Sequence, residues 1–149
     1  MIKVFDSSFR LPTVAEWVYA AIGGKNRIWK YGGSPNIMET ACYGGVLGYR
    51  NISHSMSHPL GLRLPNENGI YDLSGNIWEW CYDGFVDYVD LLSEDQPIYS
   101  PVGSHGDKFR VMRGGSWASL SDYCQLAFRL KRRLNFKDNV VGFRLARSI

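Results

Sequence analysis

No hydrophobic run in the sequence approaches the length of a transmembrane segment. The longest uncharged apolar stretches are far shorter than the about 18 residues that mark a membrane-spanning helix. The N-terminal stretch MIKVFDSSFR also lacks the apolar core of a secretory signal peptide. We therefore expect neither a membrane span nor a signal peptide.

Cysteine is scarce, and its spacing excludes the common cysteine motifs. The three cysteines are Cys42, Cys81 and Cys124, and no CxxC pair is present, so no zinc motif or dithiol redox motif is indicated. One disulfide remains an alternative. We predict three buried thiols instead, because a free cysteine behaves as a small apolar residue.

The chain also has little net charge. It contains 17 Lys and Arg residues and 14 Asp and Glu residues, for a net charge of +3, which does not by itself indicate nucleic acid. Basic residues gather locally in RLKRRLNFK, next to Phe128 and Phe136, and such a mixture can bind single strands. Because acidic residues nearly balance the basic ones over the whole chain, we favour a solvated face or a protein-binding patch over a nucleic-acid site. The basic residues are Arg129, Lys131, Arg132, Arg133 and Lys137.

The composition indicates a single folded domain spanning residues 1–149. The apolar fraction is 45% and the charged fraction 21%, both near globular averages. Aromatic residues make up 14% of the chain, and there are 16 glycines, a mixture that suits a loop-rich fold with large rings in its core. We expect four tryptophans in that core: Trp17, Trp78, Trp80 and Trp117.

The clearest predicted element is a helix in RLPTVAEWVYAAIGG. Thr13 and Glu16 form a capping box at its start, and Gly23 and Gly24 end it. Its apolar stripe is Val14, Trp17, Val18 and Ala21, at the spacing of one helix face.

The remaining predicted elements are short. One further helix is expected near residues 37–43, and strands are expected at 77–81, 109–112 and in the C-terminal VVGFRLARS. In the last strand, Phe143 and Leu145 should point to one face, and Arg144 and Ala146 to the other.

Four separated blocks carry a resemblance to one known family. RLPTVAEWVYAA, NGIYDLSGNIWEW, RVMRGGSW and GFRLARS are together similar to the formylglycine-generating enzyme (sulfatase-modifying factor) superfamily. The resemblance implies an α+β fold: a compact C-type lectin domain with short strands, few helices and long ordered loops. Family members usually have a substantial portion before the first block, so the chain resembles a minimal version of the fold.

The resemblance also bears on catalysis. Oxidase members hold copper(I) between two cysteines that follow the RGGS turn, five residues apart. Cys124 stands at the second of these positions, but Ser119 stands at the first, and a hydroxyl is a poor ligand for copper(I). We therefore expect no enzyme activity and no catalytic cofactor. A degenerate or metal-dependent enzyme is the alternative, although an iron site is disfavoured because His54, His58 and His105 show no helical arrangement.

Within the family, the C-terminal blocks most resemble the variable protein of a diversity-generating retroelement. In such proteins the segment between the RGGSW and GFR anchors, here about 118–140, is diversified and binds a ligand. The resemblance implies a ligand-binding face made by Ala118, Ser119, Leu120, Asp122, Tyr123, Phe128, Leu130, Arg132, Arg133, Phe136, Asp138, Asn139 and Val140. The anchors expected inside are Trp117, Cys124, Ala127, Arg129, Gly142 and Phe143.

The resemblance further implies a structural calcium ion in DLSGNIWE. Its ligands would be Asp72, Gly75, Ile77 and Glu79, and hard oxygen donors suit calcium. The alternative is that Asp72 and Glu79 only form hydrogen bonds that hold the turn. The partner implied by the resemblance is a protein or surface ligand, and the implied location is on a virion or inside a prokaryotic or virus-infected cell.

Overall fold

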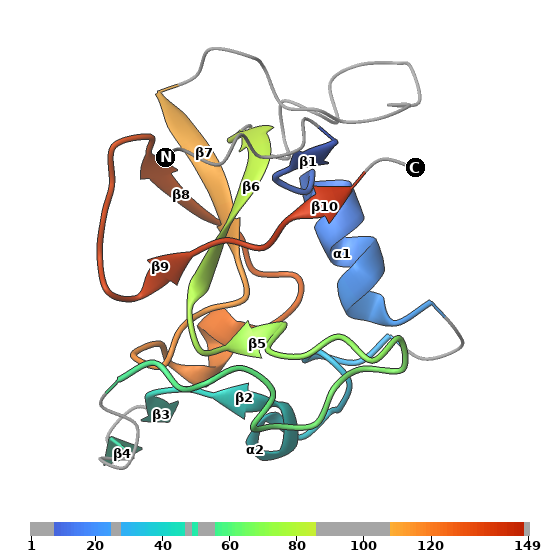
Figure 1. Ribbon diagram of the computed structural model, residues 1–149. Coiled ribbons are helices and arrows are strands. Elements are labelled where there is room, and N and C mark those ends of the chain that lie inside the picture. Colours follow the sequence, from blue (N-terminus) through green and yellow to red (C-terminus); the bar gives the residue numbers. More distant parts are fainter. Residues whose placement is uncertain (1–7, 25–27, 47–48, 51–55, 86–107, 148–149) are drawn as a thin grey trace, which may run out of the picture.

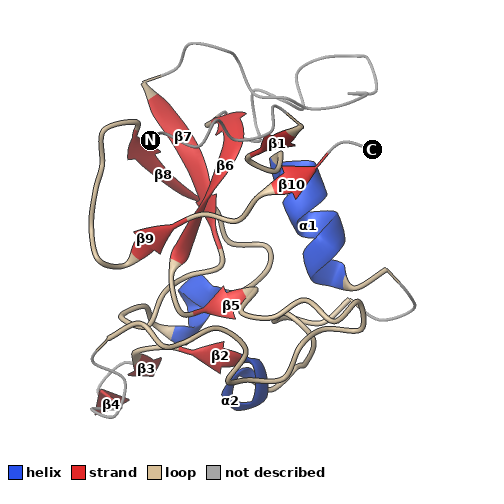
Figure 2. Ribbon diagram, in the orientation of Figure 1, coloured by secondary structure: helices blue, strands red, loops and turns tan. Residues whose placement is uncertain are grey.

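The computed structural model describes residues 8–24, 28–46, 49–50, 56–85 and 108–147. A central four-stranded sheet lies beside helix α1 (Val14–Ile22), and a loop-rich region with helix α2 (Ile37–Thr40) lies below them (Figure 1). Loops make up most of that lower region (Figure 2). Among the helices in the described part of the chain, none is both long and apolar enough to cross a bilayer.

Helix α1 begins and ends as the sequence predicts. The Glu16 N–H donates to the Thr13 hydroxyl over 3.2 Å, and the Glu16 carboxylate accepts from the Thr13 N–H over 2.8 Å. Gly23 ends the helix at a φ of 79°, a left-handed conformation that glycine adopts without strain. Trp17 and Ala21 on the predicted stripe are buried, so the stripe is the face that packs against the sheet.

The central sheet has the strand order β8-β7-β6-β9. Strands β6 (Trp78–Gly84), β7 (Phe109–Arg113) and β8 (Leu130–Arg133) are antiparallel neighbours, and β9 (Val141–Gly142) runs parallel to β6. The strands predicted at 77–81 and 109–112 are confirmed. Because β8 is an edge strand, one of its sides has no neighbouring strand in the sheet.

Three two-stranded pairs surround this sheet. Strand β1 (Phe9–Arg10) pairs with β10 (Ala146–Arg147), β2 (Ala41–Cys42) with β5 (Ser74–Gly75), and β3 (Gly45–Val46) with β4 (Tyr49–Arg50). The predicted helix near 37–43 is confirmed in its first half, since α2 ends at Thr40. A 3-10 helix, η1, covers Ser121–Cys124.

The predicted C-terminal strand is not continuous, because it breaks into β9 and β10. Its predicted alternation is seen: Phe143 is 61% exposed and Leu145 47% exposed, whereas Arg144 and Ala146 are half-buried. Arg144 turns inward between them because a buried carboxylate, Glu79, lies beneath it. An ion pair with a residue far away in the sequence therefore overrides the apolar pattern.

Two groups of buried side chains form the core. One joins α1 to the sheet and contains Trp17, Ala21, Leu73, Cys81, Val111 and Leu126; the other lies in the loop-rich region and contains Tyr31, Ala41, Tyr43 and Cys124. Trp17 and Trp78 are buried as predicted, but Trp80 and Trp117 are only half-buried. The prediction of four core tryptophans is therefore correct for two of them.

Glu79 on β6 connects three parts of the fold. Its Oε2 accepts from Trp17 Nε1 on α1 and from Arg144 Nε, and its Oε1 accepts from Arg144 Nη2, each over 2.6 Å. Arg144 Nη2 also donates to the Tyr71 carbonyl over 3.1 Å and to the Asp72 carbonyl over 3.3 Å. Glu79 is 5% exposed, so its charge depends on these donors.

Replacing Arg144 with methionine should therefore destabilise the protein strongly. The Arg144→Met variant keeps most of the side-chain volume but leaves the Glu79 carboxylate without its counter-ion. Breaking a buried pair in this way costs about 3–5 kcal/mol of unfolding free energy, measurable by urea denaturation followed by tryptophan fluorescence.

A charge-matched control is Lys108→Met, because Lys108 is exposed and such changes fall within about 0.5 kcal/mol. Adding Glu79→Gln to Arg144→Met should recover part of the loss, since a neutral amide still accepts from Trp17. Equal stability of Arg144→Met and the control would show that the pair does not hold these segments together.

Candidate functional site

The candidate site begins at the turn Arg113–Trp117, which connects β7 to the predicted binding segment, residues 118–140. Gly114 and Gly115 have φ angles of 92° and 75°, which residues with a side chain rarely adopt. A Cβ on Gly115 would also lie 2.6 Å from the Cys124 Sγ. This turn can approach Cys124 so closely only because Gly115 has no side chain.

Arg113 fixes the chain that follows Cys124. Its side chain is buried, and Nη1 donates to the Leu126 carbonyl over 3.0 Å and to the Phe128 carbonyl over 2.9 Å. Both acceptors are main-chain atoms. The contact therefore positions the backbone of this segment without depending on which side chains it carries.

Ser119 lies in a closed network of small polar groups. Its hydroxyl accepts from the Ser116 N–H over 3.0 Å, the two serine hydroxyls are 3.0 Å apart, and its carbonyl accepts from the Gly44 N–H over 2.7 Å. Ser119 is buried. Its predicted place on an exposed binding face is therefore wrong, because these bonds turn it into the turn rather than toward solvent.

Cys124 is a fully buried thiol. Burial raises its pKa to about 12, and the N–H groups of Gly75 and Ser116 offset this only in part. The thiol is thus protonated at neutral pH, whereas a metal ligand must be a thiolate. One protonated thiol and a hydrogen-bonded serine do not fit a copper(I) bis-thiolate.

All three cysteines are free and buried, so the prediction of three buried thiols is confirmed and the disulfide alternative is wrong. Burial also raises the pKa of Cys81 to about 12.

Most of the predicted binding face is accessible. Besides Ser119, seven of its residues are exposed and five are half-buried. The exposed ones are Ala118, Asp122, Tyr123, Arg132, Arg133, Asp138 and Asn139, and the half-buried ones are Leu120, Phe128, Leu130, Phe136 and Val140.

The residues expected to be buried anchors differ in their burial. Cys124 is buried as predicted, and Trp117, Arg129 and Gly142 are half-buried. Ala127 and Phe143 are exposed, which corrects the expectation for both. Phe143 is displaced outward because its neighbour Arg144 occupies the inner position.

The face residues form two groups rather than one. The Tyr123 and Phe128 rings meet edge to face at 4.9 Å, and Phe128 lies 6.0 Å from Trp78. The Trp78 N–H donates to the Val140 carbonyl over 2.8 Å, which brings Val140 to the same place. Through Trp78, the middle of the segment therefore lies near its C-terminal end.

The second group lies along edge strand β8. The Arg132 guanidinium stacks over Phe136 at 5.3 Å, and Arg133 stacks over Phe109 at 5.9 Å. Phe109 comes from β7 and was not among the predicted site residues. The signal that could have found it is the antiparallel pairing of Phe109 with Arg133, which the sequence does not reveal by itself.

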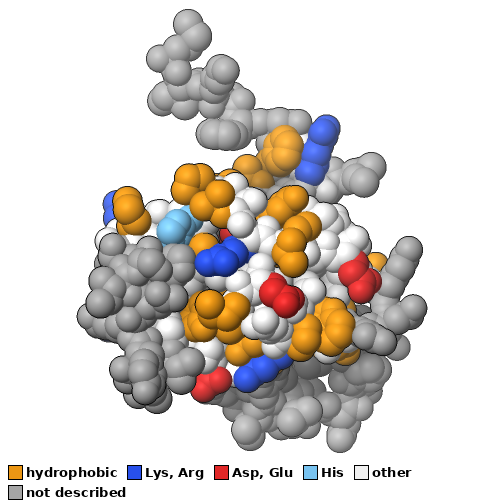
Figure 3. All heavy atoms as spheres, turned by 90° about the horizontal axis from the view of Figure 1, so that it is seen from below, with side chains coloured by type: hydrophobic (Ala, Val, Ile, Leu, Met, Phe, Trp, Pro, Cys, Tyr) orange, Lys and Arg blue, Asp and Glu red, His pale blue; other side chains and the backbone are white. Residues whose placement is uncertain are grey.

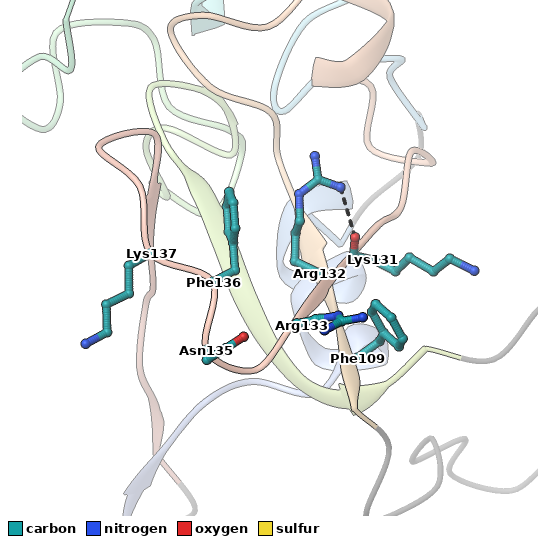
Figure 4. Close-up of a pocket in the computed structure, with 7 residues that line it drawn as sticks. All are labelled: Phe109, Lys131, Arg132, Arg133, Asn135, Phe136 and Lys137. Atoms are coloured by element: carbon teal, nitrogen blue, oxygen red, sulfur yellow. Dashed lines mark hydrogen bonds between the residues drawn. The ribbon is translucent and has the colours of Figure 1, made fainter.

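A hollow of about 490 Å³ opens at this second group (Figure 4). Its lining residues are Phe109, Lys131, Arg132, Arg133, Asn135, Phe136 and Lys137. By contrast, the face seen from below carries separate apolar patches with charges of both signs between them (Figure 3). The hollow beside β8 differs because its charged lining residues are all basic.

The residues expected to bind calcium have other partners. Both Glu79 oxygens accept from Arg144 or Trp17, and Asp72 Oδ2 accepts from the Gly61 N–H over 2.9 Å. Within the described ranges, no three His, Cys, Asp or Glu side chains gather as metal ligands. These contacts are those of the hydrogen-bonding alternative, and the calcium site at Asp72, Gly75, Ile77 and Glu79 stays a prediction.

The histidine positions add little to a metal site. His54 and His105 lie outside the described residues. The His58 backbone exchanges hydrogen bonds with the Asn76 side chain, from N–H to Oδ1 over 3.0 Å and from Nδ2 to the carbonyl over 3.2 Å. Asn76 thus holds the neighbouring loop, a role that the sequence reasoning missed.

We expect calcium to leave the stability of the protein unchanged. The positive Arg144 guanidinium already neutralises Glu79, so an added cation gains no free carboxylate there. The melting temperature should be the same in millimolar calcium chloride and in excess EGTA, measured by differential scanning fluorimetry at constant ionic strength. A rise in melting temperature with calcium, absent with magnesium, would instead establish the calcium site.

Comparison with known proteins places these features in context. A family described as "Sulfatase-modifying factor enzyme 1-like domain" matches residues 4–149. The "Formylglycine-generating enzyme" of Streptomyces coelicolor is 31% identical to the chain, over 92% of the chain and 46% of its own length. The "Serine/threonine-protein kinase pkn1" of Chlamydia pneumoniae is 33% identical, over 94% of the chain and 21% of its own length.

Among solved structures, "Treponema denticola variable protein 1" superposes with a TM-score of 0.73 and 34% sequence identity. The match covers 92% of this chain and 46% of that one. The chain therefore spans less than half the length of these relatives. The similarity confirms the predicted α+β fold of the C-type lectin, formylglycine-generating-enzyme type, and the predicted resemblance to a variable protein of a diversity-generating retroelement.

Proposed function

The chain belongs to the sulfatase-modifying factor enzyme 1-like family, and within it we propose a non-catalytic protein that binds a ligand through a variable surface. The observation that carries this proposal is the way residues 118–140 are held. Several of the contacts that hold this segment end on its main-chain atoms, whereas most of its predicted face side chains are accessible to solvent.

The main-chain contacts come from residues outside the segment. Arg113 donates to two carbonyls, Ser74 Oγ donates to the Cys124 carbonyl over 2.8 Å, and the Gly44 and Trp78 N–H groups donate to the Ser119 and Val140 carbonyls. The Leu126 N–H in turn donates to the Lys30 carbonyl over 3.0 Å. Backbone contacts of this kind survive a change of side chain, which is what a diversified surface requires.

The environment of Ser119 and Cys124 supports the absence of copper-dependent oxidation. The pair offers one thiol whose pKa is about 12 and one serine hydroxyl engaged with Ser116. The alternative is a degenerate or metal-dependent enzyme, which the similarity to formylglycine-generating enzymes favours. Ligand binding is the better-supported proposal because the site lacks a second soft ligand for copper(I).

Catalysis is tested with a peptide that carries the cysteine-containing sulfatase motif. We expect no aldehyde product from the purified protein supplied with copper(I) and oxygen, read by mass spectrometry. A Ser119→Cys variant supplies the second thiol, so its affinity for copper(I) should rise above that of the wild type in a competition titration with bicinchoninate. Turnover of the peptide by the wild-type protein would overturn the non-catalytic proposal.

The variable surface is tested by changing several exposed side chains together. The variant carries four changes: Tyr123→Ser, Arg132→Ser, Arg133→Ser and Asn139→Ser. Its free energy of unfolding should lie within about 1–2 kcal/mol of the wild-type value, since the effects of surface changes are individually small and add. Stability is measured by urea denaturation and secondary structure by circular dichroism.

The matched control for that variant is the single change Arg113→Met. It leaves the Leu126 and Phe128 carbonyls without their donor, and each unpaired buried group costs about 1–3 kcal/mol. If the fourfold surface variant loses more stability than Arg113→Met, the segment depends on its own side chains and is unsuited to diversification.

A further inference from the structure

The hollow beside β8 combines basic groups from three short stretches of chain. Phe109 comes from β7, Lys131, Arg132 and Arg133 come from β8, and Asn135, Phe136 and Lys137 follow it. In Figure 4, Arg132 and Phe136 lie side by side, and Arg133 lies against Phe109. The Lys131 and Lys137 side chains extend away on opposite sides.

No acidic side chain neutralises this group within the part of the chain that the structure describes. The ion pairs found there are Arg10–Glu16, Lys30–Asp122 and Arg144–Glu79. The acid nearest in sequence is Asp138, and its Oδ1 accepts from the Val140 N–H over 3.3 Å. Among the described residues, the four positive charges of the hollow therefore have no acidic partner.

The backbone of β8 also offers donors rather than acceptors on its open side. The Lys131 carbonyl accepts from Arg132 Nη1 over 3.1 Å, and the Arg133 carbonyl accepts from the Phe136 N–H over 2.9 Å. By the alternation of an antiparallel ladder, the peptide groups of Lys131 and Arg133 face away from β7. With its carbonyls already bonded, this edge disfavours addition of a strand but can still donate to an anion.

The arginine–phenylalanine contacts indicate which class of anion the hollow can bind. Each arginine lies over a phenylalanine, which holds the guanidinium plane in place. Arg132 Nη1 donates to the Lys131 carbonyl, and the remaining guanidinium N–H groups can donate to a carboxylate or phosphate. Single-stranded nucleic acid binds largely by stacking bases on open aromatic faces. Here the guanidinium groups occupy a face of each ring, so the geometry favours carboxylates over stacked bases.

We propose that the hollow lined by Phe109, Lys131, Arg132, Arg133, Asn135, Phe136 and Lys137 binds an acidic peptide segment of a partner protein. Arg132, Arg133 and Phe136 belong to the predicted binding face, so the inference rests on the proposed function and names its ligand class. Glu and Asp carboxylates accept paired N–H bonds from guanidinium groups, and the lysines at the two ends supply further attraction.

The test uses a fluorescein-labelled peptide of ten glutamates and measures fluorescence anisotropy at low salt. We expect saturable binding that weakens as salt is added, because exposed charges are screened. In the double variant Arg132→Gln, Arg133→Gln the affinity should fall at least about tenfold, the loss expected when charge-assisted hydrogen bonds are removed. A ten-residue glutamine peptide should not bind.

The matched control is the double variant Lys30→Gln, Arg147→Gln, which removes the same net charge away from the hollow and should bind like the wild type. Equal weakening in both double variants would overturn the proposal, since binding would then follow net charge alone. Tighter binding of a labelled ten-nucleotide oligothymidylate than of the glutamate peptide would also overturn it, in favour of nucleic acid. A lack of binding to the glutamate peptide would overturn the proposal that the hollow binds acidic peptides.

Failure of this inference can be told apart from failure of the proposed function. The peptide titration reports only on the hollow, whereas the sulfatase-peptide assay reports on catalysis and the fourfold surface variant on tolerance to change. Circular dichroism of the Arg132→Gln, Arg133→Gln variant establishes that lost binding does not reflect lost structure.

Discussion

The buried carboxylate of Glu79 is the constraint on which the arrangement of the chain depends. A carboxylate with 5% exposure is tolerable only with charged or polar donors around it, and here the donors come from opposite ends of the sequence. Trp17 brings α1 to β6, and Arg144 brings the C-terminal segment to the same strand. Arg144 lies between β9 and β10, so the ion pair adds to the pairings of β9 with β6 and of β10 with β1. The ion pair therefore also lies close in sequence to the end of segment 118–140.

The other end of that segment is fixed by the double-glycine turn. Gly115 lets the backbone pass beside Cys124, and Arg113 reaches past the turn to bind the carbonyls of Leu126 and Phe128. Between these two ends, most of the predicted face side chains are exposed, and a few of them, such as Asp138 on the Val140 N–H, add to the main-chain contacts. A surface can vary without loss of the fold only where stability and recognition are carried by different atoms, and the proposed function requires this of residues 118–140.

Local sequence patterns predicted the elements whose causes are local. The capping box of α1 and its apolar stripe need only residues within one helix, and β6 and β7 are marked by runs of large side chains. The direction of Arg144 could not be predicted in this way, because its cause is a carboxylate 65 residues away. Phe109 was missed for a related reason: it joins the site only through its pairing with Arg133 across β7 and β8. Long-range pairing, rather than propensity, decided which side chains share a face.

Ser119 has a structural role in the turn that follows β7. A thiol at this position would be a weak hydrogen-bond acceptor, whereas the serine hydroxyl accepts from the Ser116 N–H and approaches the Ser116 hydroxyl at 3.0 Å. The buried backbone donor is thereby satisfied, which avoids the cost of an unpaired polar group. Cys124 then has no thiolate partner and contributes through packing against Tyr31, Ala41 and Tyr43. The serine hydroxyl thus closes the turn from which segment 118–140 starts.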